Sequence, residues 1–258
     1  MRYLLPMTTL LLPLSILATS VHASDKQWFN SASYAHTEQS SFNSLHLNST
    51  YYFAEQQNTG IWDDFGYLDT DSKVSVSYTD NDADNFFSAS GEAFYRNFFV
   101  NATVGNLSNE DNHSIGFGYL YNDMLKLQVR TLRSDEHTDK TWFQAEYNHQ
   151  INESDYLGVT VGVQDAPDNW MISTRYFKKL NGSAFFTIDA SHEDYQLGGS
   201  VRNVMASYYV DKSLAFGAGI NDSKLQLEAK YFLSDKYFYR FGYLDRGNQV
   251  SVAFNAYF

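Results

Sequence analysis

The sequence predicts an all-β protein in which about 16 antiparallel strands form a transmembrane up-and-down β-barrel. Three observations support this fold class: an apolar leader at the start, alternation of polar and apolar residues in short segments throughout, and an uncovered phenylalanine at the end. Because successive side chains of a strand point to opposite faces, the alternation predicts a wall with one apolar and one polar face. In lipid the apolar face is solvated directly, and closure leaves no unpaired backbone edge.

The first element is a predicted secretory signal peptide over residues 1–23. Arg2 supplies its positive charge, residues 4–18 are mostly apolar, and residues 21–23 form a small-x-small cleavage site. Two prolines interrupt the apolar run, which is therefore shorter than the roughly 20 residues that a membrane-spanning helix needs. We expect residues 24–258 to form a single barrel domain after cleavage.

The composition of the chain excludes several classes of protein. The formal net charge is −12, which argues against a nucleic-acid partner, because such a partner requires a basic patch. The chain has no cysteine and therefore lacks the disulfides that hold small secreted domains together. Its mean hydropathy is polar although 17% of its residues are aromatic. A membrane barrel accounts for both values, since only every second residue faces lipid.

Alternating segments with turn-rich breaks recur along the rest of the chain, and each predicts a strand. An even number of strands returns both termini to the periplasmic side, as in bacterial barrels. Short connections such as 122–123 alternate with longer acidic ones such as 106–112, which predicts periplasmic turns and extracellular loops. The predicted strands lie near residues 27–37, 41–53, 72–80, 86–95, 98–106, 113–121, 124–133, 140–149, 155–164, 169–178, 182–191, 199–210, 213–220, 223–232, 236–244 and 248–258.

Strands that run toward the periplasm end their lipid-facing set with an aromatic residue, about once per hairpin. Amphipathic rings are most stable at the level of the lipid headgroups, so this pattern predicts an aromatic girdle. The alternative is that tyrosine simply favours strands, which explains the number of these residues but not their placement. The girdle residues are Tyr51, Phe53, Tyr95, Tyr121, Tyr147, Tyr176, Tyr208, Tyr231 and Phe258.

Charged residues at inward positions are the candidates for pore chemistry. Sixteen strands enclose a water-filled lumen, in which wall charges can select ions by sign and size. Two interpretations stay open, because these charges either set selectivity or balance one another structurally. The candidate pore-lining residues are Lys73, Glu92, Lys126, Arg130, Glu146, Arg175, Asp189, Lys224, Glu228, Lys230 and Arg240.

Residues 54–71 form the longest connection and are too apolar for a solvated turn. Long connections without secondary structure are usually functional or wrongly assigned. One interpretation is a plug that folds against the barrel mouth or into the lumen, with Ile61, Trp62, Phe65, Tyr67 and Leu68 as its apolar residues. The other is an additional partial strand, which would change the strand count to 14 or 18.

Enzymatic and metal-binding functions have little support in the sequence. The histidines are scattered over different strands and loops, and no motif joins one to a nucleophile. Residues 80–84 space three aspartates at alternate positions but lack the central glycine and distal glutamate of a calcium loop. We therefore expect no catalytic residue, no cofactor and no built metal site. Loosely held divalent ions that join the acidic loops to lipopolysaccharide are a further alternative.

The leader, the 16 short segments, Tyr51-Tyr52-Phe53 with the following Gly60–Leu68 segment, and the terminal Phe258 resemble a family of small porins of Gram-negative bacteria. The resemblance covers the whole mature chain, and its motifs are patterns more than fixed residues. It implies a passive outer-membrane channel for small hydrophilic solutes or ions. A substrate-specific channel and a non-conducting structural or adhesive barrel are the alternatives. The expected partners are lipid, lipopolysaccharide, the barrel-assembly machinery through the C-terminal strand, and two further copies in a homotrimer.

Overall fold

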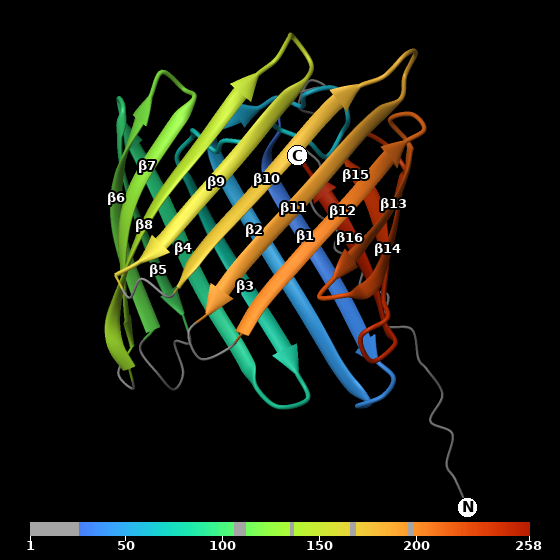
Figure 1. Cartoon of the computed structure of the whole chain (residues 1–258), viewed down its shortest axis with the longest axis horizontal. Helices are drawn as coiled ribbons and strands as arrows, with labels where there is room; N and C mark the ends of the chain where they lie inside the picture. Colours follow the sequence, from blue (N-terminus) through green and yellow to red (C-terminus); the bar gives the residue numbers. More distant parts are fainter. Residues whose placement is uncertain (1–25, 106–111, 135–136, 166–168, 196–198) are drawn as a thin grey trace, which may run out of the picture.

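The protein is a closed antiparallel barrel of 16 strands, as predicted (Figure 1). The computed structural model describes residues 26–105, 112–134, 137–165, 169–195 and 199–258, so the predicted signal peptide lies outside the described residues. The strands are β1 (Lys26–Thr37), β2 (Phe42–Gln56), β3 (Lys73–Asn81), β4 (Asn85–Tyr95), β5 (Phe98–Gly105), β6 (Asn112–Tyr121), β7 (Leu125–Ser134), β8 (His137–Gln150), β9 (Tyr156–Gln164), β10 (Trp170–Lys179), β11 (Phe185–Tyr195), β12 (Gly199–Tyr209), β13 (Leu214–Asn221), β14 (Lys224–Phe232), β15 (Tyr237–Leu244) and β16 (Gln249–Tyr257).

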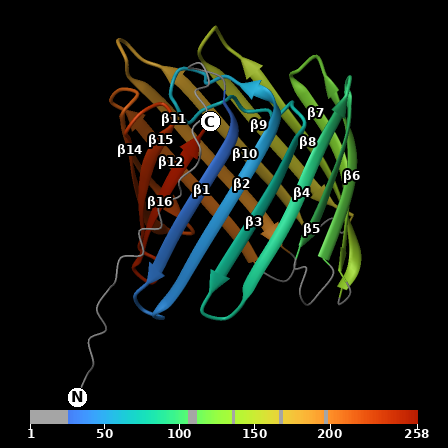
Figure 2. The ribbon, with the colours of Figure 1, turned by 180° about the vertical axis from the view of Figure 1, so that it is seen from behind.

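Each strand pairs with its neighbours in sequence, and the first and last strands close the barrel. β1 pairs with β16 from Phe29 opposite Tyr257 to Thr37 opposite Gln249. The strands run obliquely around the wall, as the two opposite views show (Figures 1 and 2). Closure therefore leaves no strand edge unpaired, which is the condition for a sheet to span a membrane.

The alternation in the sequence determines which face of each strand points outward. On β14, Leu225, Leu227 and Tyr231 are 48%, 42% and 52% exposed on the outer wall. The intervening Gln226 and Glu228 line the interior. A shift of one residue would turn the polar set outward and the apolar set inward. The apolar surroundings of the barrel therefore fix the strand register.

The connections follow the prediction only in part. Asn122 and Asp123 form a tight turn, and both have positive φ (51° and 53°), a conformation that Asn and Asp tolerate well. The expected contrast between short and long connections is wrong at several places. β13 and β14 are joined by residues 222–223 alone at the mouth expected to carry long loops, whereas residues 151–155 join β8 and β9 at the other mouth. Strands β7 and β8 also extend into the predicted loop 134–140, because polar residues continue the backbone ladder as readily as apolar ones.

We call the end of the barrel where β16 finishes the C-terminal mouth. Phe258 lies just beyond β16, and its carbonyl oxygen accepts hydrogen bonds from the N–H groups of Gln27 and Trp28 at 2.5 and 2.7 Å. The chain end is thus joined to the start of β1. No helix among the described residues is long and apolar enough to cross a membrane.

Candidate functional site in the lumen

The connection between β2 and β3 folds into the C-terminal mouth instead of leaving it. Residues 57–72, here called the inner segment, contain neither strand nor helix. Both ribbon views show this segment inside the mouth, near the C-terminus (Figures 1 and 2). The barrel keeps 16 strands, so the alternative of an additional partial strand is wrong. The predicted connection began at residue 54, but residues 54–56 continue β2.

Apolar side chains of the inner segment pack against the inner wall. Ile61 is 1% exposed, and the ring of Trp62 lies 5.9 Å from that of Phe232. Phe65 packs edge-on against Phe29 of β1 at 4.9 Å between ring centroids. Ile61 belongs to a core cluster with Tyr156, Phe177, Phe185, Tyr209, Ala215, Phe232 and Phe238. Inward aromatic residues at this mouth therefore provide an apolar seat for a segment that would otherwise lie in water.

Glycine makes room for one ring of the inner segment. A Cβ atom on Gly158 of β9 would overlap the ring of Tyr67. The Tyr67 hydroxyl forms a hydrogen bond of 2.7 Å with Oγ1 of Thr160, two residues further along the same face. Leu68 is half-buried. A wall residue without a side chain thus fixes where the segment contacts β9.

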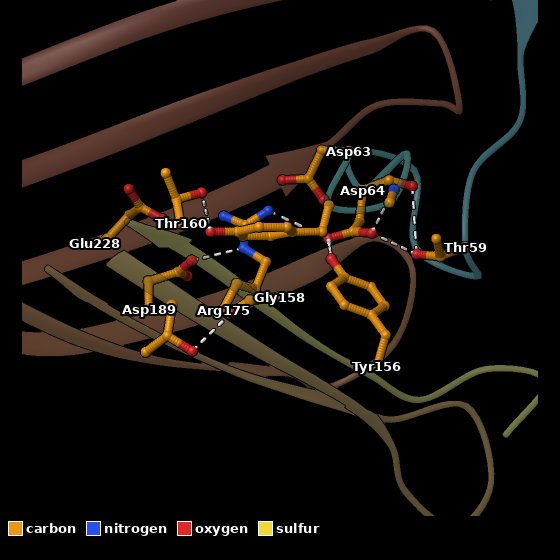
Figure 3. A network of polar contacts seen from close by, with 12 residues as sticks. Thr59, Asp63, Asp64, Tyr156, Gly158, Thr160, Arg175, Asp189 and Glu228 are labelled. Carbon is orange, nitrogen blue, oxygen red and sulfur yellow. Dashed lines mark hydrogen bonds and ion pairs between the residues drawn. The ribbon is translucent and has the colours of Figure 1, made fainter. Parts of the chain in front are cut away.

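Asp64 is the polar centre of the contact between the inner segment and the wall (Figure 3). Its Oδ1 accepts a hydrogen bond from Oγ1 of Thr59 at 2.6 Å within the segment. Its Oδ2 accepts one from the Tyr156 hydroxyl at 2.7 Å and lies 3.3 Å from Nη1 of Arg175. Arg175 also donates through Nε to Asp189 at 2.6 Å. The carboxylate is 3% exposed, so these donors replace the water that it loses.

Asp63 forms a second bond between the inner segment and the wall. Lys230 Nζ donates to Asp63 Oδ2 at 2.7 Å, and the Tyr209 hydroxyl donates to the same oxygen at 3.2 Å. Lys230 also donates to the Tyr209 hydroxyl at 2.8 Å. The Lys230 and Asp63 side chains are only 16% and 7% exposed. Two adjacent carboxylates therefore bind cations on different strands, β10 and β14.

The far end of the inner segment is fixed to the opposite wall. Asp69 forms an ion pair with Lys73 at the start of β3 and accepts a hydrogen bond from Tyr52 at 3.1 Å. Its backbone carbonyl accepts from Nζ of Lys126 on β7 at 2.9 Å. Lys126 is buried and also pairs with Glu92 of β4 at 2.7 Å. The inner segment thus crosses the mouth between two polar clusters, and is bonded at each.

The structure brings most of the predicted pore-lining residues into these two clusters. Lys73, Glu92 and Lys126 belong to the cluster around Asp69. The five in the other cluster are Arg175, Asp189, Glu228, Lys230 and Arg240. Arg130, Glu146 and Lys224 have the same inward parity: Arg130 and Lys224 are exposed, and Glu146 accepts a hydrogen bond from Gln144 at 3.0 Å.

A polar cavity of about 200 Å³ lies between Asp63, Asp64 and the wall of β10 to β15. We call it the lumen cavity. Its charged lining consists of Asp63, Asp64, Asp189 and Glu228 against Arg175, Lys230 and Arg240. Glu228 lies 3.6 Å from Lys230 and 4.0 Å from Arg240. Mixed charges therefore meet on one side of the lumen, next to the inner segment.

The predicted girdle residues lie on the outer wall near the C-terminal mouth. Tyr176 and Phe258 are half-buried, and the Phe258 ring packs against Tyr237 at 5.6 Å. The others are exposed, namely Tyr51 (39%), Phe53 (61%), Tyr95 (74%), Tyr121 (54%), Tyr147 (42%), Tyr208 (45%) and Tyr231 (52%). Their placement at the lipid headgroups stays a prediction.

The acidic residues of the inner segment were not among the predicted site residues. Of the predicted pore-lining residues, seven are basic and four are acidic. Asp63, Asp64 and Asp69 of the inner segment offset this basic excess. A usable signal was present, since Asp63-Asp64 interrupt the apolar run Ile61-Trp62 before Phe65. Acidic residues inside such a run are expected to have partners when the run is buried. Within the described part of the chain, no group of three His, Asp or Glu residues is arranged to hold a metal ion.

Comparison with known proteins agrees with the barrel architecture. The solved structures similar to this chain include the Acinetobacter baumannii outer membrane protein Omp33, with 15% identity, a TM-score of 0.55, and coverage of 91% of this chain and 98% of the other. An engineered variant of the Rhodopseudomonas blastica porin is similar at 10% identity, a TM-score of 0.55, and coverage of 90% and 99%. At these identities the likeness shows the fold alone. The comparison with curated proteins found no match.

A family model described as "Putative general bacterial porin" matches residues 1–258. This match covers the entire chain, including the inner segment and the closing strand. The chain therefore belongs to this family of bacterial porins, the channel-forming barrels of the outer membrane.

Proposed function

We propose that the chain passes small hydrophilic solutes and ions passively, and that the inner segment forms the narrowest part of its channel. The observation that carries this proposal is the seating of the segment across the mouth, with Ile61 1% exposed against the wall. A solute that crosses the lumen must pass beside the segment. The segment then acts as an internal plug, which narrows the pore without adding a strand to the barrel.

The contacts of the inner segment support a fixed constriction. Ordering a backbone residue costs about 1–2 kcal/mol, so a segment without secondary structure needs many contacts to stay in place. Burial of Ile61 and Trp62 and the bonds of Asp63 and Asp64 to Lys230 and Arg175 supply such contacts. Because both ends of the segment continue into strands, we expect it to stay in the mouth while ions flow.

The wall charges are proposed to act on ions that pass the constriction. Arg130 and Arg240 are the most exposed of the inward arginines. Lys126 is buried and Lys230 is only 16% exposed, and both are held in ion pairs. Exposed charges act on passing ions, while buried pairs hold structure. Selectivity should therefore depend more on the two arginines than on the two lysines.

The orientation, export and partners of the barrel belong to the same proposal. The C-terminal mouth, with its girdle of aromatic residues, faces the periplasm. Residues 1–23 are removed during export. The terminal strand with Phe258 is the segment that the barrel-assembly machinery recognises. Acidic residues at the opposite mouth, such as Asp80 and Asp82, face lipopolysaccharide. We further propose a homotrimer. We also propose a function without catalysis, which the porin family and the barrel fold favour.

Liposome swelling with neutral sugars of increasing size tests the constriction. Gly158→Ala places a methyl group where the ring of Tyr67 lies, so the segment must shift. We expect this variant to admit larger sugars and to raise swelling rates about twofold or more. Gly91→Ala is the matched control, because its Cβ would meet its nearest neighbour at an ordinary 3.5 Å. Equal rates for the wild type and Gly158→Ala would contradict the constriction, and no swelling at all would contradict passive passage.

A further inference from the structure

The lumen cavity carries buried hydrogen-bond acceptors that the mixed-charge network does not use. Oδ1 of Asp63, Oδ1 of Asn203 and Oε1 of Gln226 are buried and have no hydrogen-bond partner among the described residues. All three residues line the cavity, from the inner segment, β12 and β14 respectively. The Asp63 side chain is 93% buried, since 7% of it is exposed.

Each cationic side chain of the cavity lining lies beside a carboxylate. Lys230 binds Asp63 at 2.7 Å, and Arg175 binds Asp189 at 2.6 Å. Arg240, the most exposed cation of the lining, lies 4.0 Å from Glu228. Four carboxylates against three cations leave a formal charge of −1 on the lining. The lining therefore combines a net negative charge with three buried acceptor oxygens that have no partner in the described part of the chain.

We infer that the lumen cavity is a binding subsite for a small organic cation, a solute whose ammonium or guanidinium group donates hydrogen bonds to Asp63, Asn203 and Gln226. A planar guanidinium has donors in a fixed fork and is weakly hydrated, which suits several acceptors in one recess. An unpaired buried carboxylate oxygen gains most from such a donor.

The size of the cavity limits the class of solute. Its volume of about 200 Å³ is below the roughly 300–1,000 Å³ of pockets for drug-sized ligands. A head group with a short stem fits this volume, and a longer solute would extend into the lumen. The inference rests on the proposed function in one respect, because passage beside the inner segment brings solutes to the cavity.

Calorimetric titration of the refolded protein in detergent micelles with methylguanidinium chloride tests the subsite. Sodium chloride serves as the ionic-strength control and sodium acetate as the anionic probe. We expect saturable binding of methylguanidinium and none of acetate. Loss of one hydrogen bond to a charged group should weaken binding about tenfold in Asn203→Leu and in Gln226→Leu.

Asn148→Leu is the matched control variant. Oδ1 of Asn148 is also buried without a partner in the described part of the chain, but Asn148 lies on β8 and does not line the cavity. Its variant should bind methylguanidinium as the wild type does. Absence of saturable binding, preference for acetate, or equal weakening by Asn148→Leu would overturn the subsite. Because the titration needs no ion flow, a protein that binds without conducting would count against the channel alone, and one that conducts without binding against the subsite alone.

Discussion

At the scale of single residues, the inner segment depends on Asp64, a buried carboxylate whose two oxygens both accept hydrogen bonds. Asp64 accepts from Thr59 within the segment and from Tyr156 on the wall, and it faces Arg175. Burial of a carboxylate without such donors costs several kcal/mol of desolvation free energy. The donors on the wall therefore determine where Asp64 lies. Asp63, its neighbour, points to a different strand through Lys230.

Asp64→Asn should loosen the segment and destabilise the protein. The amide keeps the shape but loses the charge that faces Arg175, and its –NH2 group places donors where one carboxylate oxygen accepted hydrogen bonds. Because Arg175 retains Asp189, we expect a loss of about 1–3 kcal/mol in the free energy of unfolding. Urea unfolding in micelles measures it. Asp80→Asn, at an exposed position of the opposite mouth, should change stability by less than about 0.5 kcal/mol, and an equal effect of both would contradict the role of Asp64.

Asp155, in the connection between β9 and the preceding strand, should make stability depend on pH. Burial opposes its ionisation, but the N–H of Lys179 and the side chains of Asn152 and Ser154 donate hydrogen bonds to it and lower its pKa. Because this pKa is lower in the folded than in the unfolded state, the carboxylate stabilises the fold at pH values above its unfolded pKa of about 3.9. This stabilisation is lost as the pH falls through the pKa of the folded state. Asp155→Asn should therefore be less stable than the wild type at neutral pH. Urea unfolding should show that this difference in the free energy of unfolding disappears at acidic pH. A difference that is constant with pH would contradict this.

At the scale of elements, the strands could be predicted, whereas the sequence left the inner segment open between a plug and an additional partial strand. Alternation locates strands because the two faces of each strand meet different solvents, and the predicted and observed bounds of β4 and β9 differ by one residue at most. Connection lengths are harder to predict. A polar residue near a mouth has about the same exposure whether it continues a strand or belongs to the connection. The contacts of the inner segment are the hardest of all. Asp63 and Lys230 are 167 residues apart, and no local pattern joins them.

Adjacent residues of β3 test which face of the wall is outside. Val76 is 46% exposed on the outer wall, whereas Ser77 faces inward and forms a hydrogen bond of 2.7 Å with Ser88. Arginine at a lipid-facing position near the midplane costs about 2–4 kcal/mol, and lumen positions tolerate it better. Val76→Arg should therefore lose about that much folding free energy in lipid vesicles, measured by urea titration. A larger loss for Ser77→Arg would reverse the assigned faces.

At the scale of the whole molecule, the barrel supplies a wall and the inner segment supplies the restriction. The inner segment joins the two polar clusters across the lumen, by Asp69 at one end and by Asp63 and Asp64 at the other. Replacing the segment should therefore widen the channel without opening the barrel, since all 16 strands keep their partners.

Single-channel conductance in planar bilayers, with the wild type beside a variant whose residues 57–71 are replaced by a short Gly-Ser linker, tests this account most directly. We predict discrete steps for the wild type and steps about twofold or more larger for the variant, because the linker leaves the mouth unobstructed. Unchanged heat-dependent gel migration of the variant would establish that its barrel is intact. Equal steps from both proteins, or no steps from either, would contradict a channel that the inner segment narrows.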